Sequence, residues 1–82
     1  MGAYVLINAA KNVRVKTILD RLRAISGVTF AHSLIGPHDI IAYIEPHELG
    51  ELQPLLDREI RKLVDDQVIV STDVRLVVSS AF

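Results

Sequence analysis

The segment of this sequence best suited to bind a ligand is a turn of four residues, Gly36-Pro37-His38-Asp39, between two hydrophobic runs. Glycine adopts backbone dihedral angles that other residues avoid, and it lets a ligand approach the main chain closely. Asp39 adds a carboxylate where the next hydrophobic run begins. The same residue types are typical of an ordinary hairpin turn. The turn therefore predicts a candidate binding site, but no reaction.

The other polar residues predict no catalytic or metal centre. The three histidines are scattered: His32 lies in an apolar run, His38 in the turn and His47 after a proline. The chain has no cysteine, which excludes disulfides, zinc–thiolate sites and a thiol nucleophile. No glycine-rich phosphate loop and no serine–histidine–aspartate arrangement stands out. We therefore expect no enzymatic activity, no catalytic residue, no metal and no cofactor.

The elements that position the turn follow from the spacing of the apolar residues. Helical spacing predicts one helix between an N-cap at Asn12 and a terminating Gly27, and a second after Pro46 that ends near residue 65. Pro54 interrupts the second helix and predicts either a bend or a start near Gln53. Runs of β-branched and aliphatic residues predict four strands, at residues 3–8, 28–35, 40–45 and 68–80.

The order strand–helix–strand–strand–helix–strand predicts an α+β fold, the ferredoxin-like βαββαβ sandwich. Its four-stranded antiparallel sheet carries both helices on one face. The first and third strands are apolar on both sides, and 50% of the 82 residues are hydrophobic. A domain of this length buries only about 60% of the surface that its unfolded chain exposes. We therefore expect the bare face to meet that of a second copy, forming a dimeric α+β barrel.

Charge and hydropathy limit the partners of the chain. Nine basic and ten acidic residues give a net charge of −1, which argues against a dedicated surface for nucleic acid or anionic membrane. The basic stretch 11–23 is better explained as a solvated helix face. No apolar run reaches the roughly 20 residues of a membrane span. We expect a cytoplasmic protein that binds neither membrane nor, directly, nucleic acid.

The whole pattern resembles the ligand-binding C-terminal domain, often called the RAM domain, of the Lrp/AsnC family of amino-acid-responsive transcription regulators. The resemblance extends from Tyr4 to about Val78. It rests on the element order and on three local patterns: the Gly27-Val28 pair, Gly36-x-x-Asp39 followed by Ile40-Ile41, and the hydroxyl pair Ser71-Thr72 on the last strand.

The resemblance implies a non-enzymatic effector-sensing and oligomerisation module. Such domains pair through their sheets, the dimers associate into rings that are often octamers, and amino-acid ligands bind between dimers near the hairpin turn. His38 stands where the family commonly has an aromatic residue, and Pro37 removes one amide donor. A carboxylate such as that of Asp39 can pair with an ammonium group. The ligand-binding residues implied are Gly36, Pro37, His38 and Asp39, with Ser71 and Thr72 as weaker candidates.

Full regulators of this family also carry a helix-turn-helix, whereas residues 1–82 are expected to form one RAM-like domain without a DNA-binding unit. The resemblance then implies that the chain co-assembles with full-length Lrp/AsnC regulators. Three other functions stay open: a small cofactor-free dimeric ferredoxin-like monooxygenase with a pocket lined by His32 or His38, an ACT-type regulatory domain, and an RNA-binding domain that uses Tyr4 and Tyr43.

Overall fold

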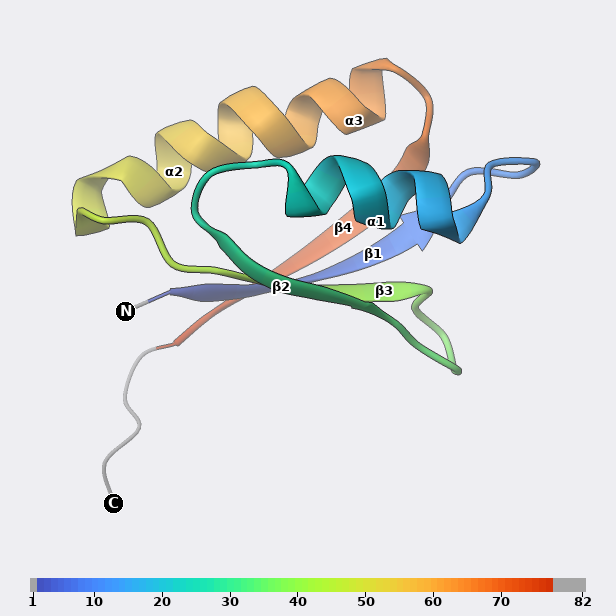
Figure 1. Ribbon diagram of the computed structural model, residues 1–82, viewed down its shortest axis with the longest axis horizontal. Helices are drawn as coiled ribbons and strands as arrows, with labels where there is room; N and C mark the ends of the chain where they lie inside the picture. Colours follow the sequence, from blue (N-terminus) through green and yellow to red (C-terminus); the bar gives the residue numbers. More distant parts are fainter. Residues whose placement is uncertain (1, 78–82) are drawn as a thin grey trace.

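The computed structural model describes residues 2–77 and shows two layers, a four-stranded antiparallel sheet with its helices on one face (Figure 1). The strand order across the sheet is β2-β3-β1-β4, so β2 and β4 form the edges. This arrangement confirms the predicted ferredoxin-like sandwich. The strands are β1 (Ala3–Ala9), β2 (Val28–Ser33), β3 (Ile40–Ile44) and β4 (Ile69–Leu76).

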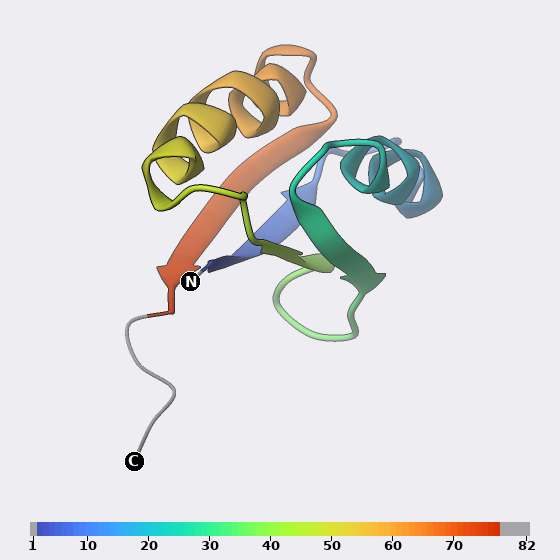
Figure 2. The ribbon, with the colours of Figure 1, turned by 60° about the vertical axis from the view of Figure 1, so that its left-hand side comes forward.

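Two helical segments lie side by side over the sheet, α1 (Val15–Arg23) near β2 and the second along β4 (Figure 2). Pro54 falls in the first turn of α2, where backbone N–H groups have no partner inside the helix. Of the two predicted alternatives, the later helix start is therefore close to the observed one. The second segment consists of η1 (Leu49–Glu51), α2 (Leu52–Leu55), the π turn η2 (Leu56–Ile60) and α3 (Arg61–Asp65).

Alternation along the central strands divides the sheet into a core face and an uncovered face. Every second residue of β1 and β3 is fully buried against the helices. The residues between them point to the opposite face, as their alternation predicts. The buried strand residues are Ala3, Val5, Ile7, Ile40, Ala42 and Ile44, and α1 adds Ile18 and Leu22.

The ends of α1 differ from the prediction. Arg14, not Asn12, occupies the N-cap position, and its side chain makes no capping hydrogen bond. Asn12 instead has a φ of 67° in the turn that follows β1. Gly27 has the expected positive φ, 100°, but the helix already ends at Arg23 with Ala24 as its C-cap. Gly27 therefore turns the chain into β2 and does not cap the helix.

Two β-bulges interrupt simple alternation in the edge strands. In β2, Val28 pairs with Ile44 and Phe30 with Tyr43, so the bulge turns Val28 toward the core. In β4 a register shift beside Asn8 buries Ile69. Simple alternation fails at both places because a bulge inserts one extra residue into one strand. β2 also ends at Ser33, two residues earlier than predicted, and residues 78–80 of the predicted last strand lie outside the described residues.

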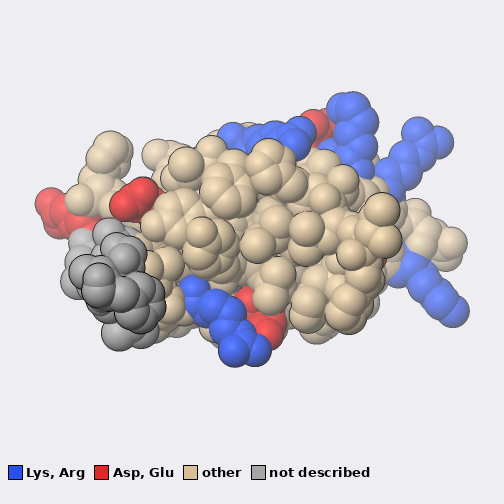
Figure 3. All heavy atoms as spheres, turned by 90° about the horizontal axis from the view of Figure 1, so that it is seen from below, with Lys and Arg blue, Asp and Glu red and all other residues tan. Residues whose placement is uncertain are grey.

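No helix among residues 2–77 is long and apolar enough to cross a membrane. The sheet face opposite the helices is broad and largely free of charge, and charged side chains lie mainly around its margin (Figure 3). No element of the described part of the chain covers this face.

Candidate functional site

The predicted ligand turn is a closed loop between β2 and β3. Leu34 N donates a hydrogen bond to Asp39 O at 2.8 Å, and Asp39 N donates to Ile7 O of β1 at 2.9 Å. Gly36 has a φ of 143°, and a Cβ added there would meet no atom within 4 Å. Backbone conformation, not lack of space, is therefore the reason for glycine at this position.

The Asp39 carboxylate, predicted to pair with a ligand ammonium group, already has a partner within the chain. Its Oδ2 accepts a hydrogen bond from Ala9 N at 2.8 Å, in a half-buried position. This bond joins the turn to the end of β1, where the ladder to β4 changes register. Among residues 2–77, no donor reaches the other oxygen, Oδ1. Asp39 therefore has a structural role and one oxygen left for a further donor.

His38, beside Asp39, contributes an unsatisfied polar atom. The residue is half-buried. Its Nδ1 is buried and has no hydrogen-bond partner, and no other buried side-chain nitrogen or oxygen of the described residues lacks one. The pKa of Asp73 on β4 is lowered chiefly by the hydrogen bond from Arg75, whose Nε and Nη2 donate to Asp73 at 3.0 and 2.9 Å. The charge of Arg75 and, least, that of His38 also contribute to the lowering.

The structure separates the two hydroxyl residues that the resemblance places together. Ser71 lies opposite Asn8 on the uncovered face, and its Oγ accepts a hydrogen bond from Asn8 Nδ2 at 3.1 Å. Thr72 lies opposite Ile7 and therefore points toward the helices. The turn and Ser71 thus gather around residues 7–9 of β1 on the uncovered face, whereas Thr72 is on the other side of the sheet.

A row of aromatic rings crosses the uncovered face from β1 through β3 to β2. Tyr4 and Tyr43 have ring centroids 4.9 Å apart, Tyr43 and Phe30 5.8 Å, and Phe30 and His32 4.9 Å with nearly parallel planes. Burial, followed by the charges of Glu45 and Tyr4, raises the pKa of Tyr43. The spacing of the apolar residues does not predict that Phe30 joins the two tyrosines, because the bulge that aligns Phe30 with Tyr43 leaves no signal in it.

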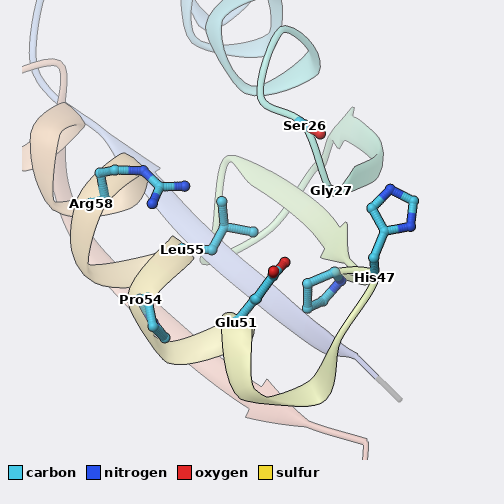
Figure 4. A pocket seen from close by; sticks show the side chains of 8 residues that line it. Ser26, Gly27, His47, Glu51, Pro54, Leu55 and Arg58 are labelled. Carbon is cyan, nitrogen blue, oxygen red and sulfur yellow. The ribbon is translucent and has the colours of Figure 1, made fainter.

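Three hollows of the described part of the chain lie on the helix side of the sheet, and residues 36–39 line none of these three. The first, of about 260 Å³, lies between the loop before β2 and the start of the second helical segment (Figure 4). Its floor is Leu55, and the Glu51 carboxylate points into it. The second, about 300 Å³, lies between the end of α1 and α3, and the third, about 540 Å³, lies between the second helical segment and β4.

Nothing in the described residues forms a metal centre, because no three histidine, aspartate or glutamate side chains of residues 2–77 lie together. The chemistry available on the uncovered face is therefore hydrogen bonding, charge pairing and apolar contact. The sequence did not point to Asn8 or to the Asp73–Arg75 pair, although an acidic and a basic residue two apart on one strand share a face.

Comparisons with known proteins find no matching family model and no matching curated protein. Solved structures do match. FFRP-DM1 is 24% identical with a TM-score of 0.82, over 95% of this chain and 100% of that one. The hypothetical protein PHS023 from Pyrococcus horikoshii is 23% identical with a TM-score of 0.82, over 96% of this chain and 90% of that one.

E. coli AsnC is 22% identical, with a TM-score of 0.82 over 99% of this chain but only 52% of AsnC. The chain thus spans about half the length of AsnC and nearly all of FFRP-DM1. Since AsnC gives its name to the family that the sequence resembles, the resemblance is confirmed at the level of the fold. The chain has the ferredoxin-like fold that AsnC, FFRP-DM1 and PHS023 share.

Proposed function

We propose that the chain is a non-enzymatic assembly and sensing module of the Lrp/AsnC regulatory type. It pairs with a second copy through the uncovered face and binds a small amino-acid-like effector beside the turn. The observation that carries the proposal is the uncovered face, which holds five apolar or aromatic side chains on three neighbouring strands. These residues are Tyr4, Leu6, Phe30, Ile41 and Tyr43.

A second sheet is the partner that best fits this face. Two sheets pack about 10 Å apart, so the side chains of their inner faces meet directly. The polar residues of β4, such as Asp73 and Arg75, lie at one margin of the apolar area. RNA binding is less suitable, because aromatic platforms for nucleic acid lie beside basic side chains. Arg75 is the single lysine or arginine on this face of the described strands, and it is paired with Asp73.

The corner around the turn supports the effector site. Asp39 Oδ1 can accept from an ammonium group, and the unpartnered His38 Nδ1 offers a second polar contact. Because the turn lies open at the surface of one chain, a neighbouring subunit would enclose the ligand. From its resemblance to the Lrp/AsnC family, the module is also proposed to assemble into rings, up to octamers, and to join full-length Lrp/AsnC regulators. The monooxygenase alternative needs a pocket at His32 or His38, and none of the three hollows contains either residue.

The oligomeric state tests the first half of the proposal. Ile41→Lys places a charge at the centre of the uncovered face, whereas Ile35→Lys makes the same exchange at a fully exposed turn position. Sedimentation should show a smaller species for Ile41→Lys than for the wild type, with wild-type behaviour for Ile35→Lys. A wild-type chain that sediments as a monomer, or an Ile41→Lys variant that assembles normally, would overturn the sheet-to-sheet contact.

Thermal unfolding with each of the twenty amino acids tests the second half. A ligand present at a hundred times its Kd adds about 2.7 kcal/mol of stability, which raises Tm measurably. Asp39→Asn is the informative variant, because an amide oxygen can still accept from Ala9 N while the negative charge is lost. We expect stabilisation of the wild type and none of Asp39→Asn. If no amino acid raises the Tm of the wild type, the chain is an assembly module without this effector site.

A further inference from the structure

β4 is an edge strand with one unused side. Among residues 2–77 it pairs with β1 alone. Val77 N donates to Gly2 O at 2.9 Å, and bonding in an antiparallel pair falls on alternate residues. Residues 71, 73 and 75 therefore direct their backbone groups toward β1. Thr72, Val74 and Leu76 direct theirs outward, where they are available to another strand.

The same edge has little of the usual protection against pairing. Natural sheets protect exposed edges with charged side chains, proline or short strands. β4 has eight residues and neither proline nor lysine, and its two charges, Asp73 and Arg75, neutralise each other. Val74 and Val64 also line the hollow of about 540 Å³ between β4 and the second helical segment. Four of the seven large apolar side chains that are most exposed lie on β4 or beside it, Val64 (41%), Val70 (63%), Val74 (38%) and Leu76 (61%).

We propose that β4 pairs antiparallel with β4 of a second copy, about a two-fold axis at Val74. In this register Val74 lies opposite the partner's Val74, and Thr72 lies opposite the partner's Leu76. These are the residues whose backbone groups point outward, so each opposing pair can exchange two hydrogen bonds. The two sheets would then form one continuous sheet.

Charge selects this register over its neighbours. On the uncovered face, Asp73 would lie opposite the partner's Arg75, and Arg75 opposite the partner's Asp73. These are positions without backbone bonds, where opposing Cα atoms are only about 4.5 Å apart and side chains are close. A register centred on Asp73 or on Arg75 would instead oppose like charges, which destabilises a strand pair. The carboxylate and guanidinium already in contact within one chain would thus join those of the partner.

The edge contact is separate from the sheet-to-sheet contact and does not depend on it. It uses the backbone of β4, side chains on its helix side and the Asp73–Arg75 pair at the margin of the uncovered face. The other contact uses the aromatic row on β1, β2 and β3. A chain with both contacts assembles beyond a dimer, with each copy meeting two different neighbours.

Cross-linking tests the register directly, because the chain has no cysteine of its own. In the proposed pair, opposing Cα atoms at position 74 are about 5.5 Å apart, within disulfide reach. Position 70 is the matched control, since its two copies would be eight residues apart along the strands, roughly 27 Å. Under mild oxidation Val74→Cys should form a covalent dimer, and Val70→Cys should not. Equal cross-linking of both variants, or of neither, would overturn the proposal.

A charge exchange separates β4 from any other occupant of this edge. Asp73→Arg and Arg75→Asp, each combined with Val74→Cys, should each cross-link roughly tenfold more slowly alone. A mixture of the two should recover the rate as a mixed dimer, because opposite charges face each other again. A slow mixture would overturn the proposed register.

Repeating the Val74→Cys experiment with Ile41→Lys present shows whether the edge pairs when the sheet face does not. The same covalent dimer is expected, and its loss would contradict the independence of the two contacts.

Discussion

The uncovered sheet face and the β4 edge are both exposed in the single chain, but they differ in the groups that they offer to a partner. The face offers aromatic and aliphatic side chains, whose burial is favourable in almost any orientation. The edge offers directional backbone groups and a pair of opposite charges, so it favours one partner register. The face is thus expected to supply most of the free energy of association, and the edge most of its specificity.

The largest expected effect separates the two surfaces by thermal stability. Tyr43→Lys removes a ring from the middle of the aromatic row and places a charge there. Burying one large apolar side chain contributes about 1.5–3 kcal/mol, and each kcal/mol shifts Tm by about 4–8 °C in a domain of this size. Calorimetry at several protein concentrations should show a Tm lower by roughly 10 °C and much less dependent on concentration.

For Tyr43→Phe, which keeps the ring, the dependence of Tm on concentration should persist. If Tyr43→Lys retained the wild-type concentration dependence, the face would not be the main source of association energy.

Val74→Lys should act on assembly and hardly at all on folding. Val74 is already 38% exposed in the single chain, and exposed substitutions usually change the free energy of unfolding by less than about 0.5 kcal/mol. In the assembly each lysine would face that of its partner. Light scattering should therefore show a smaller species that still dimerises, with a Tm close to that of the wild type. A large fall in Tm would mean that Val74 belongs to the core.

The sequence predicted the features that follow from the periodic spacing of apolar residues within one element. It did not predict the features that depend on contacts between distant segments. The alternation in β1 and β3 identified the core face and the uncovered face, because residues two apart in a strand share a side. The bulges in β2 and β4 shift that period and could not be anticipated. The bond between Asp39 and Ala9 joins residues 30 apart, so the turn gave no sign that its carboxylate was already in use.

The place of β4 at the edge depends on the same kind of information. Its sequence predicts a strand, but the place of that strand in the sheet depends on how the helical connections cross from one strand to the next. The resemblance assigned Ser71 and Thr72 to one site, yet adjacent residues of a strand face opposite ways. Only the register shows that Ser71 is the one near the turn. A family pattern points to positions in the chain, and the side-chain direction at each position must come from the structure.

Alkaline pH should loosen the face and leave the edge intact. The pKa of Tyr43 is raised above its ordinary value of 10.0, chiefly by burial. An acid whose pKa is raised by folding or association contributes stability below its ordinary pKa, and that contribution is lost as the pH rises through the raised value. Sedimentation above pH 10 should show the sheet contact dissociating. Tyr43→Phe, which cannot ionise, should shift this dissociation to higher pH. Identical profiles for the two proteins would show that Tyr43 is not the controlling group.

Acid should have the opposite and smaller effect, on the edge. The pKa of Asp73 is lowered from its ordinary value of 3.8, first by the hydrogen bond from Arg75. A carboxyl group with a lowered pKa contributes stability above its ordinary pKa, and this is lost as the pH falls through the lowered value. Light scattering on Ile41→Lys, which keeps only the edge contact, should therefore show the edge dimer weakening below pH 3.8. A version also carrying Asp73→Asn should form a weak edge dimer at every pH. The effect is small because both side chains are partly exposed, so salt should weaken it further. A sheet contact that fell in step with the edge would indicate general acid unfolding.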